Sequence, residues 1–212
     1  MRVRVALLVP VAVLFFGSAQ AQDSRLTGCG DPKPDVRIAA CTEYILKGGQ
    51  GIKSELAKAY SNRGNGYVAK GLYVPAIRDF DMAISLDPDL GLAYNNRCYA
   101  LAELERFDRA LTDCDKALAL LPGNGQVLDS RGYVYFRLGR FQDAIHDLDE
   151  ALALFAIPSA LYVRGAAKLK LGDAAGQADV KQAIGLDPSI AKSMAALGVV
   201  PQLFTEANAP IR

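Results

Sequence analysis

Apolar and small residues recur along this chain in a pattern that repeats about every 34 residues. Three motifs mark the pattern: an arginine before a small residue, an alanine three residues before an aspartate, and an alanine followed by a proline. The first motif occurs at Arg63-Gly64, Arg97-Cys98, Arg131-Gly132 and Arg164-Gly165. The second occurs at Ala76/Asp79, Ala110/Asp113 and Ala144/Asp147, with a degenerate copy at Gly176/Asp179. The third occurs at Ala83/Pro88, Ala117/Pro122, Ala151/Pro158 and Ala183/Pro188.

Each copy of the pattern predicts a pair of antiparallel helices. The first helix ends near a glycine or a polar turn, and the second ends before a proline, which disfavours a helical conformation in the residue it follows. A single helical hairpin cannot bury its own apolar face, so successive copies must stack on one another. The sequence therefore predicts an all-α solenoid, which is more often a surface for partners than a catalytic vessel.

The pattern also predicts how the chain is divided. Residues 158–188 form a degenerate fourth copy, one residue short between its helices, and residues 190–197 read as a short helix that covers the exposed apolar end. The predicted units are a signal peptide at 1–21, an N-terminal segment at 22–56, repeats at 57–90, 91–124 and 125–157, the degenerate repeat at 158–188, and a capping helix with a loose tail at 189–212.

The N-terminal segment carries its own signals. Asp31-Pro32 predicts the start of a helix, with aspartate as the cap and proline in the first turn. The glycines of residues 48–51 predict the end of that helix and a flexible link to the first repeat.

An export signal precedes the repeats. Arg2 and Arg4 give a positive start, residues 5–16 are apolar, and Ala19-Gln20-Ala21 is a small-x-small cleavage site, so cleavage is expected before Gln22. No second long apolar stretch follows, so no membrane span is expected. We expect an exported, periplasmic protein of a Gram-negative bacterium.

One motif offers an alternative to simple export. Leu26-Thr27-Gly28-Cys29 resembles a bacterial lipoprotein cleavage box, whose cysteine is lipidated. The apolar run ends well before it, however, and Asp23 and Arg25 intervene, so lipidation is not expected.

Charge excludes one class of partner. Without Arg2 and Arg4, the 24 basic residues fall to 22 against 23 acidic ones, a net charge near −1. Neither a basic patch nor a run of like charge points to nucleic acid.

The four cysteines predict two disulfides, because an even number behind an export signal favours pairing. Cys98 and Cys114 are equidistant from Arg106 in the predicted turn of the second hairpin, so they face each other. The other hairpins place a glycine opposite a large residue here. Cys98 therefore pairs with Cys114, and Cys29 with Cys41 by remainder. The alternative is buried free thiols that pack as small apolar groups.

The repeats resemble those of the tetratricopeptide repeat (TPR) proteins. In the first copy the resemblance is carried by Tyr60, Gly64, Tyr67, Gly71, Tyr73, Ala76, Phe80, Ala83 and Pro88, in the second by Tyr94, Cys98, Leu101, Phe107, Ala110, Cys114, Ala117 and Pro122, and in the third by Leu128, Gly132, Tyr135, Gly139, Phe141, Ala144, Leu148 and Ala151. The resemblance implies a right-handed superhelix of helix pairs and a protein-binding role. The signature tryptophan is absent, and the export signal and paired cysteines resemble those of small exported bacterial repeat proteins.

Repeating arginines and aspartates predict a structural ladder of ion pairs, within a hairpin or between neighbours. A row of anion-binding groups is the alternative function of these arginines. The ladder comprises Arg63, Arg97, Arg131 and Arg164 with Asp79, Asp113, Asp147 and Asp179.

Partner binding is expected on the concave face, which the first helices line in the TPR family. Helical phase selects the exposed positions there, namely Asn62, Asn65, Asn95, Asn96, Tyr99, Asp129, Tyr133, Phe136 and Arg137. Tyrosine and arginine are common anchors in binding sites. TPR clamps for acidic chaperone C-termini carry basic residues where this chain has Ser61, Gln126 and Ser130, so that role is not expected.

Catalytic, metal and cofactor sites are not expected. His146 is the single histidine and falls on an outer helix face, and no nucleophile motif or phosphate-binding glycine loop is present. We therefore expect an adaptor or scaffold that holds a partner peptide or helix. The alternatives are a structural envelope component that self-associates through its end helices, and an enzyme or small-ligand binder with a closed pocket.

Overall fold

The structure is a computed structural model that describes residues 28–201. The predicted signal peptide and the tail beyond Pro201 lie outside the described residues. The described residues form helices and turns without a strand. The elements are α1 (Pro34–Leu46), a 3₁₀ turn η1 (Gly48–Gly51), α2 (Lys53–Ala69), α3 (Tyr73–Leu86), α4 (Gly91–Glu103), α5 (Phe107–Leu120), α6 (Gly125–Arg137), α7 (Phe141–Leu154), α8 (Pro158–Lys170), α9 (Gly176–Leu186) and α10 (Ile190–Ala196).

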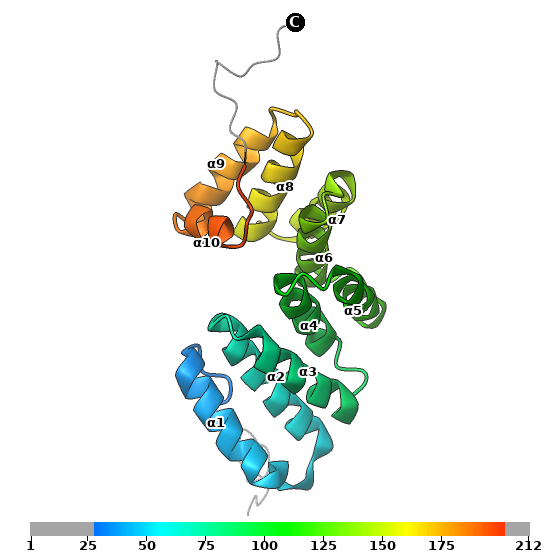
Figure 1. The fold of residues 1–212 in the computed structure, drawn as a ribbon, viewed down its shortest axis with the longest axis vertical. Coiled ribbons are helices and arrows are strands. Elements are labelled where there is room, and N and C mark those ends of the chain that lie inside the picture. Colours follow the sequence, from blue (N-terminus) through cyan, green and yellow to red (C-terminus); the bar gives the residue numbers. More distant parts are fainter. Residues whose placement is uncertain (1–27, 202–212) are drawn as a thin grey trace, which may run out of the picture.

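Helix pairs stack in chain order to form a superhelix (Figure 1). The hairpins are α2/α3, α4/α5, α6/α7 and α8/α9, with α1 packed on α2 and α10 packed on α8 and α9. The first helices of successive hairpins also contact one another: α2 touches α4, α4 touches α6, and α6 touches α8. These four helices therefore line the inner, concave side, and the predicted all-α solenoid is confirmed.

Close approach within each hairpin depends on a small residue opposite a large one. A Cβ atom on Gly64 would lie 2.6 Å from the Phe80 ring, and one on Gly132 would lie 2.7 Å from Leu148. Both large side chains are fully buried. The missing Cβ atoms thus let the two helices of a hairpin pack around Phe80 and Leu148 without an empty space.

The second hairpin replaces this pair with a disulfide. Cys98 on α4 and Cys114 on α5 are bonded, with their Cα atoms 5.5 Å apart. Its helix turn also differs, because Glu105 adopts a φ of 57° where the other hairpins place a glycine. The second hairpin is therefore held covalently across a turn that its sequence does not favour.

The start of the first helix departs from the sequence prediction. Helix α1 begins at Pro34, so the predicted start at Asp31-Pro32 is wrong. The Asp31 carboxylate instead accepts a hydrogen bond from the Lys33 N–H at 2.7 Å, which forms a turn before the helix. The link between α1 and α2 contains the 3₁₀ turn η1 at residues 48–51.

A second disulfide fixes α1. Cys29 and Cys41 are bonded, which ties the turn before α1 to the middle of that helix. The Cys29 sulfur is therefore engaged, and a thioether-linked lipid at that atom would require the disulfide to be absent.

Candidate functional site

Arginine–aspartate pairs connect the two helices of every hairpin. Each guanidinium donates two hydrogen bonds from Nε and Nη2 to the two carboxylate oxygens of its aspartate. The donor–acceptor distances are 2.8 and 2.8 Å for Arg63–Asp79, 2.7 and 2.6 Å for Arg97–Asp113, 2.7 and 2.9 Å for Arg131–Asp147, and 2.8 and 2.6 Å for Arg164–Asp179. This bidentate geometry is the strong form of the interaction.

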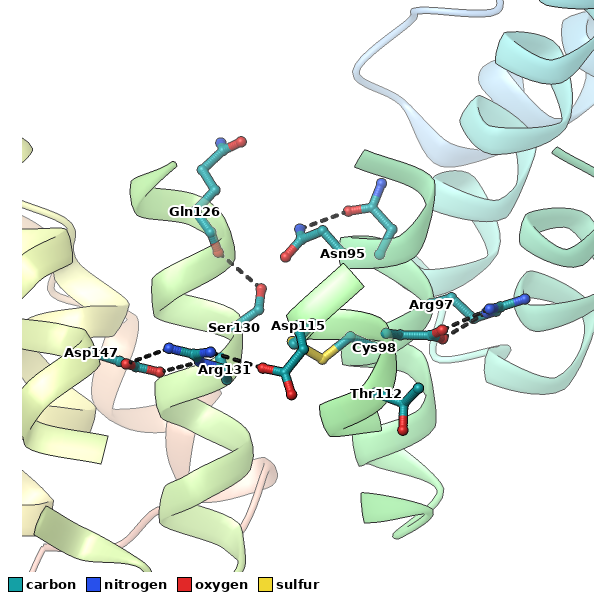
Figure 2. Close-up of a disulfide and its surroundings, with 12 residues drawn as sticks. Asn95, Arg97, Cys98, Thr112, Asp115, Gln126, Ser130, Arg131 and Asp147 are labelled. Carbon is teal, nitrogen blue, oxygen red and sulfur yellow. Dashed lines mark hydrogen bonds and ion pairs between the residues drawn. A yellow bond between two sulfur atoms is a disulfide. The ribbon is translucent and has the colours of Figure 1, made fainter. Parts of the chain in front are cut away.

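The remaining nitrogen of each arginine reaches the preceding unit. Figure 2 shows Arg131 between Asp147 of its own hairpin and Asp115 of the hairpin before it. The Nη1 donor lies 2.7 to 2.8 Å from the acceptor in three cases, Arg97 with Asp81, Arg131 with Asp115 and Arg164 with Asp149. In the first repeat the acceptor is the Thr42 hydroxyl of α1, at 3.2 Å. The ladder therefore runs both within and between units.

The burial of its aspartates indicates that the ladder has a structural role. Asp79, Asp113, Asp147 and Asp179 are all buried. The hydrogen bond with Asp147 raises the pKa of the Arg131 guanidinium, although burial acts against it. Because Nε, Nη1 and Nη2 of each arginine already donate to acceptors of the same chain, the arginines have little capacity left for an external anion.

A row of three tyrosines follows the concave side across three hairpins. The Tyr73 and Tyr99 ring centroids are 6.5 Å apart in an edge-on arrangement, and the Tyr99 and Tyr133 centroids are 5.8 Å apart. Tyr99 retains partial exposure, whereas Tyr133 is buried. Tyr73 and Tyr99, the partly exposed members of the row, present aromatic surface with polar edges, which suits a protein partner.

A buried carboxylate organises this row. Glu103, at the end of α4, accepts a hydrogen bond from the Tyr133 hydroxyl at 2.5 Å. Arg137 in turn donates to the Tyr133 oxygen at 2.7 Å, and its Nη1 lies 3.8 Å from Glu103. Burial, followed by the effects of Glu103, raises the pKa of Tyr133 and of Tyr99, so both remain neutral phenols in ordinary buffers. We call Tyr73, Tyr99, Glu103, Tyr133 and Arg137 the tyrosine network.

The predicted exposure of the concave residues is only partly correct. Asn95, Tyr133 and Phe136 are 7%, 5% and 7% exposed, so the prediction that they are exposed is wrong. Phe136 packs on Phe141 at 5.5 Å between ring centroids, because the hairpin turn folds α7 against the end of α6. Tyr133 is covered by Tyr99 and by the chain near Leu197, whose carbonyl oxygen is 3.5 Å from the Tyr133 hydroxyl.

The other predicted binding residues lie along the same inner helices and are partly exposed. Asn62 and Asn65 lie on α2, and the Asn96 amide on α4 donates to the Asn65 carbonyl oxygen at 2.8 Å. The buried Asn95 donates to Asn96 at 3.2 Å. These asparagines therefore connect neighbouring hairpins and leave a narrower polar surface than helical phase predicts.

Asp129 extends this surface toward α8. It accepts a hydrogen bond from the Ser159 hydroxyl at 2.7 Å. Burial raises the pKa of its carboxyl group to about 6, against the opposing effect of that hydrogen bond. Asp129 is therefore a concave carboxyl group whose pKa lies above that of an ordinary aspartate.

Two residues of the tyrosine network were missed by the sequence-based selection of site residues. Tyr73 was used only as a marker of the repeat, and Glu103 falls beside the apolar residues Leu101 and Ala102. A charged residue in such a run could have signalled a buried acceptor. The contact with Leu197 had no local signal, because it joins residues on different units.

Within residues 28–201 no helix is long and apolar enough to cross a membrane. The same region contains no group of three or more histidine, cysteine or acidic side chains placed to hold a metal ion. His146 lies exposed on α7.

A second surface lies at the loops between hairpins. Leu154 and Phe155, which end α7, are 49% and 71% exposed. They border a hollow of about 820 Å³ that also includes Leu121, Pro122 and Ile157. This apolar hollow lies away from the tyrosine network.

Comparisons with known proteins agree with this architecture. Sequence models of the tetratricopeptide repeat match residues 57–90, 91–124 and 130–193. No curated protein sequence matches the chain.

Several solved structures resemble the chain. The first TPR of Spaghetti (RPAP3), bound to the HSP90 peptide SRMEEVD, is 27% identical with a TM-score of 0.53, over 56% of this chain and 95% of that one. A thermophilic TPR protein of Thermus thermophilus, TTC0263, is 19% identical with a TM-score of 0.64, over 79% and 91% of the two chains. MamA of Desulfovibrio magneticus RS-1 is 16% identical with a TM-score of 0.60, over 80% and 93%. The last two likenesses concern the fold alone.

Proposed function

The chain belongs to the tetratricopeptide repeat family, and we propose from this that it is a non-catalytic adaptor whose concave groove binds a peptide or helix of a partner protein. The observation that carries the proposal is the tyrosine network, whose residues lie on the inner helices α4 and α6 and, for Tyr73, at the start of α3. It gathers three aromatic rings, one carboxylate and one guanidinium on one face, in a geometry fixed before any partner arrives. A preformed face lowers the ordering cost of binding.

The peptide-bound relative supports this use of the groove. The first TPR of Spaghetti (RPAP3) carries a bound HSP90 peptide and is 27% identical to this chain. That peptide ends in acidic residues, whereas the groove of this chain already contains Glu103 and sets Arg137 against it. We therefore assign the groove to protein partners in general and not to acidic chaperone tails.

The proposed compartment is the periplasm of a Gram-negative bacterium. Two disulfides, Cys29–Cys41 and Cys98–Cys114, are consistent with an oxidising environment. The predicted export signal at residues 1–21 provides the route. An adaptor there would hold envelope proteins together.

Photo-crosslinking tests the proposed groove. A photoreactive phenylalanine analogue at Tyr99, which is partly exposed in the middle of the network, should capture a specific envelope protein from a periplasmic extract. The matched control carries the analogue at His146, on the outer side of α7. Once the partner is identified, Tyr99→Ala should weaken its binding about 10-fold or more, because central aromatic anchors dominate binding energy.

Two results would contradict the groove assignment. One is equal capture from Tyr99 and His146, which would indicate nonspecific labelling. The other is unchanged partner affinity in a folded Tyr99→Ala variant, which would place the binding surface elsewhere.

Self-association as a structural envelope component is the second candidate function. It is favoured by the exposed apolar side chains of Leu154 and Phe155 beside the inter-hairpin hollow. The C-terminal end of the superhelix is less suited to this role than the sequence suggested, because α10 packs on α8 and α9 there. A light-scattering concentration series separates the candidates: an adaptor keeps a constant mass, whereas an assembling component grows.

A further inference from the structure

The last described residues of the chain return to the concave groove. Helix α10 ends in a left-handed turn at Gly198, where φ is 77°. The Gly198 N–H donates to Ala195 O at 3.1 Å and the Val199 N–H donates to Met194 O at 2.9 Å, the pattern of a Schellman helix end. The turn directs residues 197–201, which we call the C-terminal segment, away from the axis of α10 (Figure 1).

The C-terminal segment is held against the tyrosine network. The Leu197 carbonyl, one of the helix-end carbonyls that lack an intrahelical partner, faces Arg137 at 3.4 Å and the Tyr133 hydroxyl at 3.5 Å. Val199 is fully buried in the main hydrophobic core, whereas the next residue, Val200, is 58% exposed. One backbone carbonyl of the segment therefore faces the tyrosine network, and one aliphatic side chain of the same segment is buried in the hydrophobic core that includes Tyr133.

The polar contacts of this segment are weak compared with those inside the network. The Tyr133 hydroxyl has one proton, and its 2.5 Å contact with Glu103 takes it in preference to the 3.5 Å contact with Leu197. Arg137 likewise donates to Tyr133 at 2.7 Å, against 3.4 Å to Leu197. The network can thus remain assembled when the segment leaves.

Charge in the groove defines what can replace the segment. Arg137 lies 3.3 Å from Glu105 and 3.8 Å from Glu103, so its charge is already opposed by two carboxylates. These carboxylates would repel an acidic ligand, and the network residues include no unpaired cation to offset that repulsion. A neutral ligand would not be repelled by these carboxylates.

We propose that the C-terminal segment is an internal ligand of the groove and that the partner is a neutral segment with an aliphatic side chain, which takes the place of Val199. The inference rests on the proposed function of the groove and adds the chemistry of its ligand and its regulation. Because the segment is part of the chain, a partner binds only the fraction of molecules in which it has been released, and its apparent affinity falls by that fraction.

The inference is tested on the chain without residues 1–21, the predicted signal peptide. Its affinity for two labelled peptides is measured by fluorescence anisotropy. The neutral probe is a labelled peptide of residues 193–201, SMAALGVVP, and the acidic probe is SRMEEVD, the peptide bound by the structural relative. Val199→Asp should release the segment and increase affinity for the neutral probe about 10-fold or more over wild type. The matched control Val200→Asp changes the adjacent exposed residue and should bind like wild type.

A second variant, Gly198→Ala, keeps the test decisive if Val199→Asp does not fold. A Cβ atom on Gly198 meets nothing within 4 Å, so Gly198→Ala strains only the left-handed turn. That strain should weaken closure and increase neutral-probe affinity about fivefold or more. Circular dichroism identifies which variants are folded.

Each outcome decides one claim. Equal neutral-probe affinity in wild type and in the folded opening variants would overturn the internal-ligand assignment. Preferential binding of SRMEEVD by those variants would overturn the neutral-partner assignment. A different result would count against the proposed adaptor function: the photoreactive analogue at Tyr99 captures no partner, although the opening variants still bind the neutral probe more tightly than wild type does. The two failures are therefore distinguishable.

Discussion

Removal of Arg131 is the sharpest test of the ladder. Its guanidinium bonds Asp147, whose side chain is 3% exposed, and also Asp115, whose side chain is 59% exposed. One arginine thus contacts a buried and an exposed carboxylate at similar distances, 2.7 and 2.8 Å. Distance alone predicts equal importance of the two contacts, whereas desolvation predicts that they differ strongly.

The expected costs follow from what each change leaves behind. Arg131→Met leaves the Asp147 charge buried without its partner, which typically costs about 3–5 kcal/mol, and the partial exposure of the arginine reduces our expectation to about 2–4 kcal/mol. Asp115→Asn removes only an exposed contact and should cost about 1 kcal/mol or less. The double variant Arg131→Met/Asp147→Leu removes both charges and should recover most of the loss.

Equilibrium urea unfolding followed by circular dichroism at 222 nm measures these differences at neutral pH. The slope of free energy against urea should stay constant across the set, so that midpoint shifts report stability. If Arg131→Met costs no more than Asp115→Asn, the desolvation argument fails. If the double variant is as unstable as Arg131→Met, the loss comes from packing and not from an orphaned charge.

The remaining predictions concern two glycines and one carboxyl group. Gly132→Ala should destabilise the fold by about 1–3 kcal/mol, because the new Cβ would lie 2.7 Å from Leu148, whereas the matched helix variant Gly185→Ala meets nothing within 4 Å and should stabilise by about 0.5–1 kcal/mol. Urea midpoints check both, and a destabilised Gly185→Ala would contradict the packing argument. The Asp129 carboxyl has a folded pKa of about 6 against an ordinary value of 3.8, so protonation favours the folded state and its contribution is lost as pH rises through 6. The free energy of unfolding of Asp129→Asn should therefore exceed that of wild type by up to about 3 kcal/mol at pH 8, with the difference closing toward pH 4. A pH-independent difference would contradict the shift.

The ladder could be predicted from the sequence in period but not in full connectivity. Arginine and aspartate recur once per unit, which left pairing within a hairpin and pairing between neighbours equally open. Both occur, because the guanidinium offers one edge to Asp147 and a separate Nη1 donor to Asp115. The recurrent Asp-x-Asp spacing, seen at Asp113 and Asp115, was the available signal for the second acceptor.

The groove was harder to predict from the sequence, for a different physical reason. Helical phase gives the direction of a side chain but not what other elements place over it. Tyr133 points to the concave side as expected, yet Leu197 approaches it from 64 residues away. A repeat pattern describes contacts between neighbouring units, so a contact made once, outside the period, leaves no trace in it.

The last hairpin of the ladder differs from the other three at the position that would reach a further unit. In each of the first three hairpins the second helix offers the next unit a carboxylate, as Asp149 does for Arg164. The equivalent position of α9, two residues after Asp179, is Lys181. A further hairpin, or a second copy stacked in register, would set its arginine against this lysine and lose the acceptor that every internal junction has. Because α10 already packs on α8 and α9, the chain completes this end with apolar contacts, and its C-terminal segment continues into the groove. Helix α10, which packs on this hairpin, thus also leads into the segment proposed to occupy the binding surface.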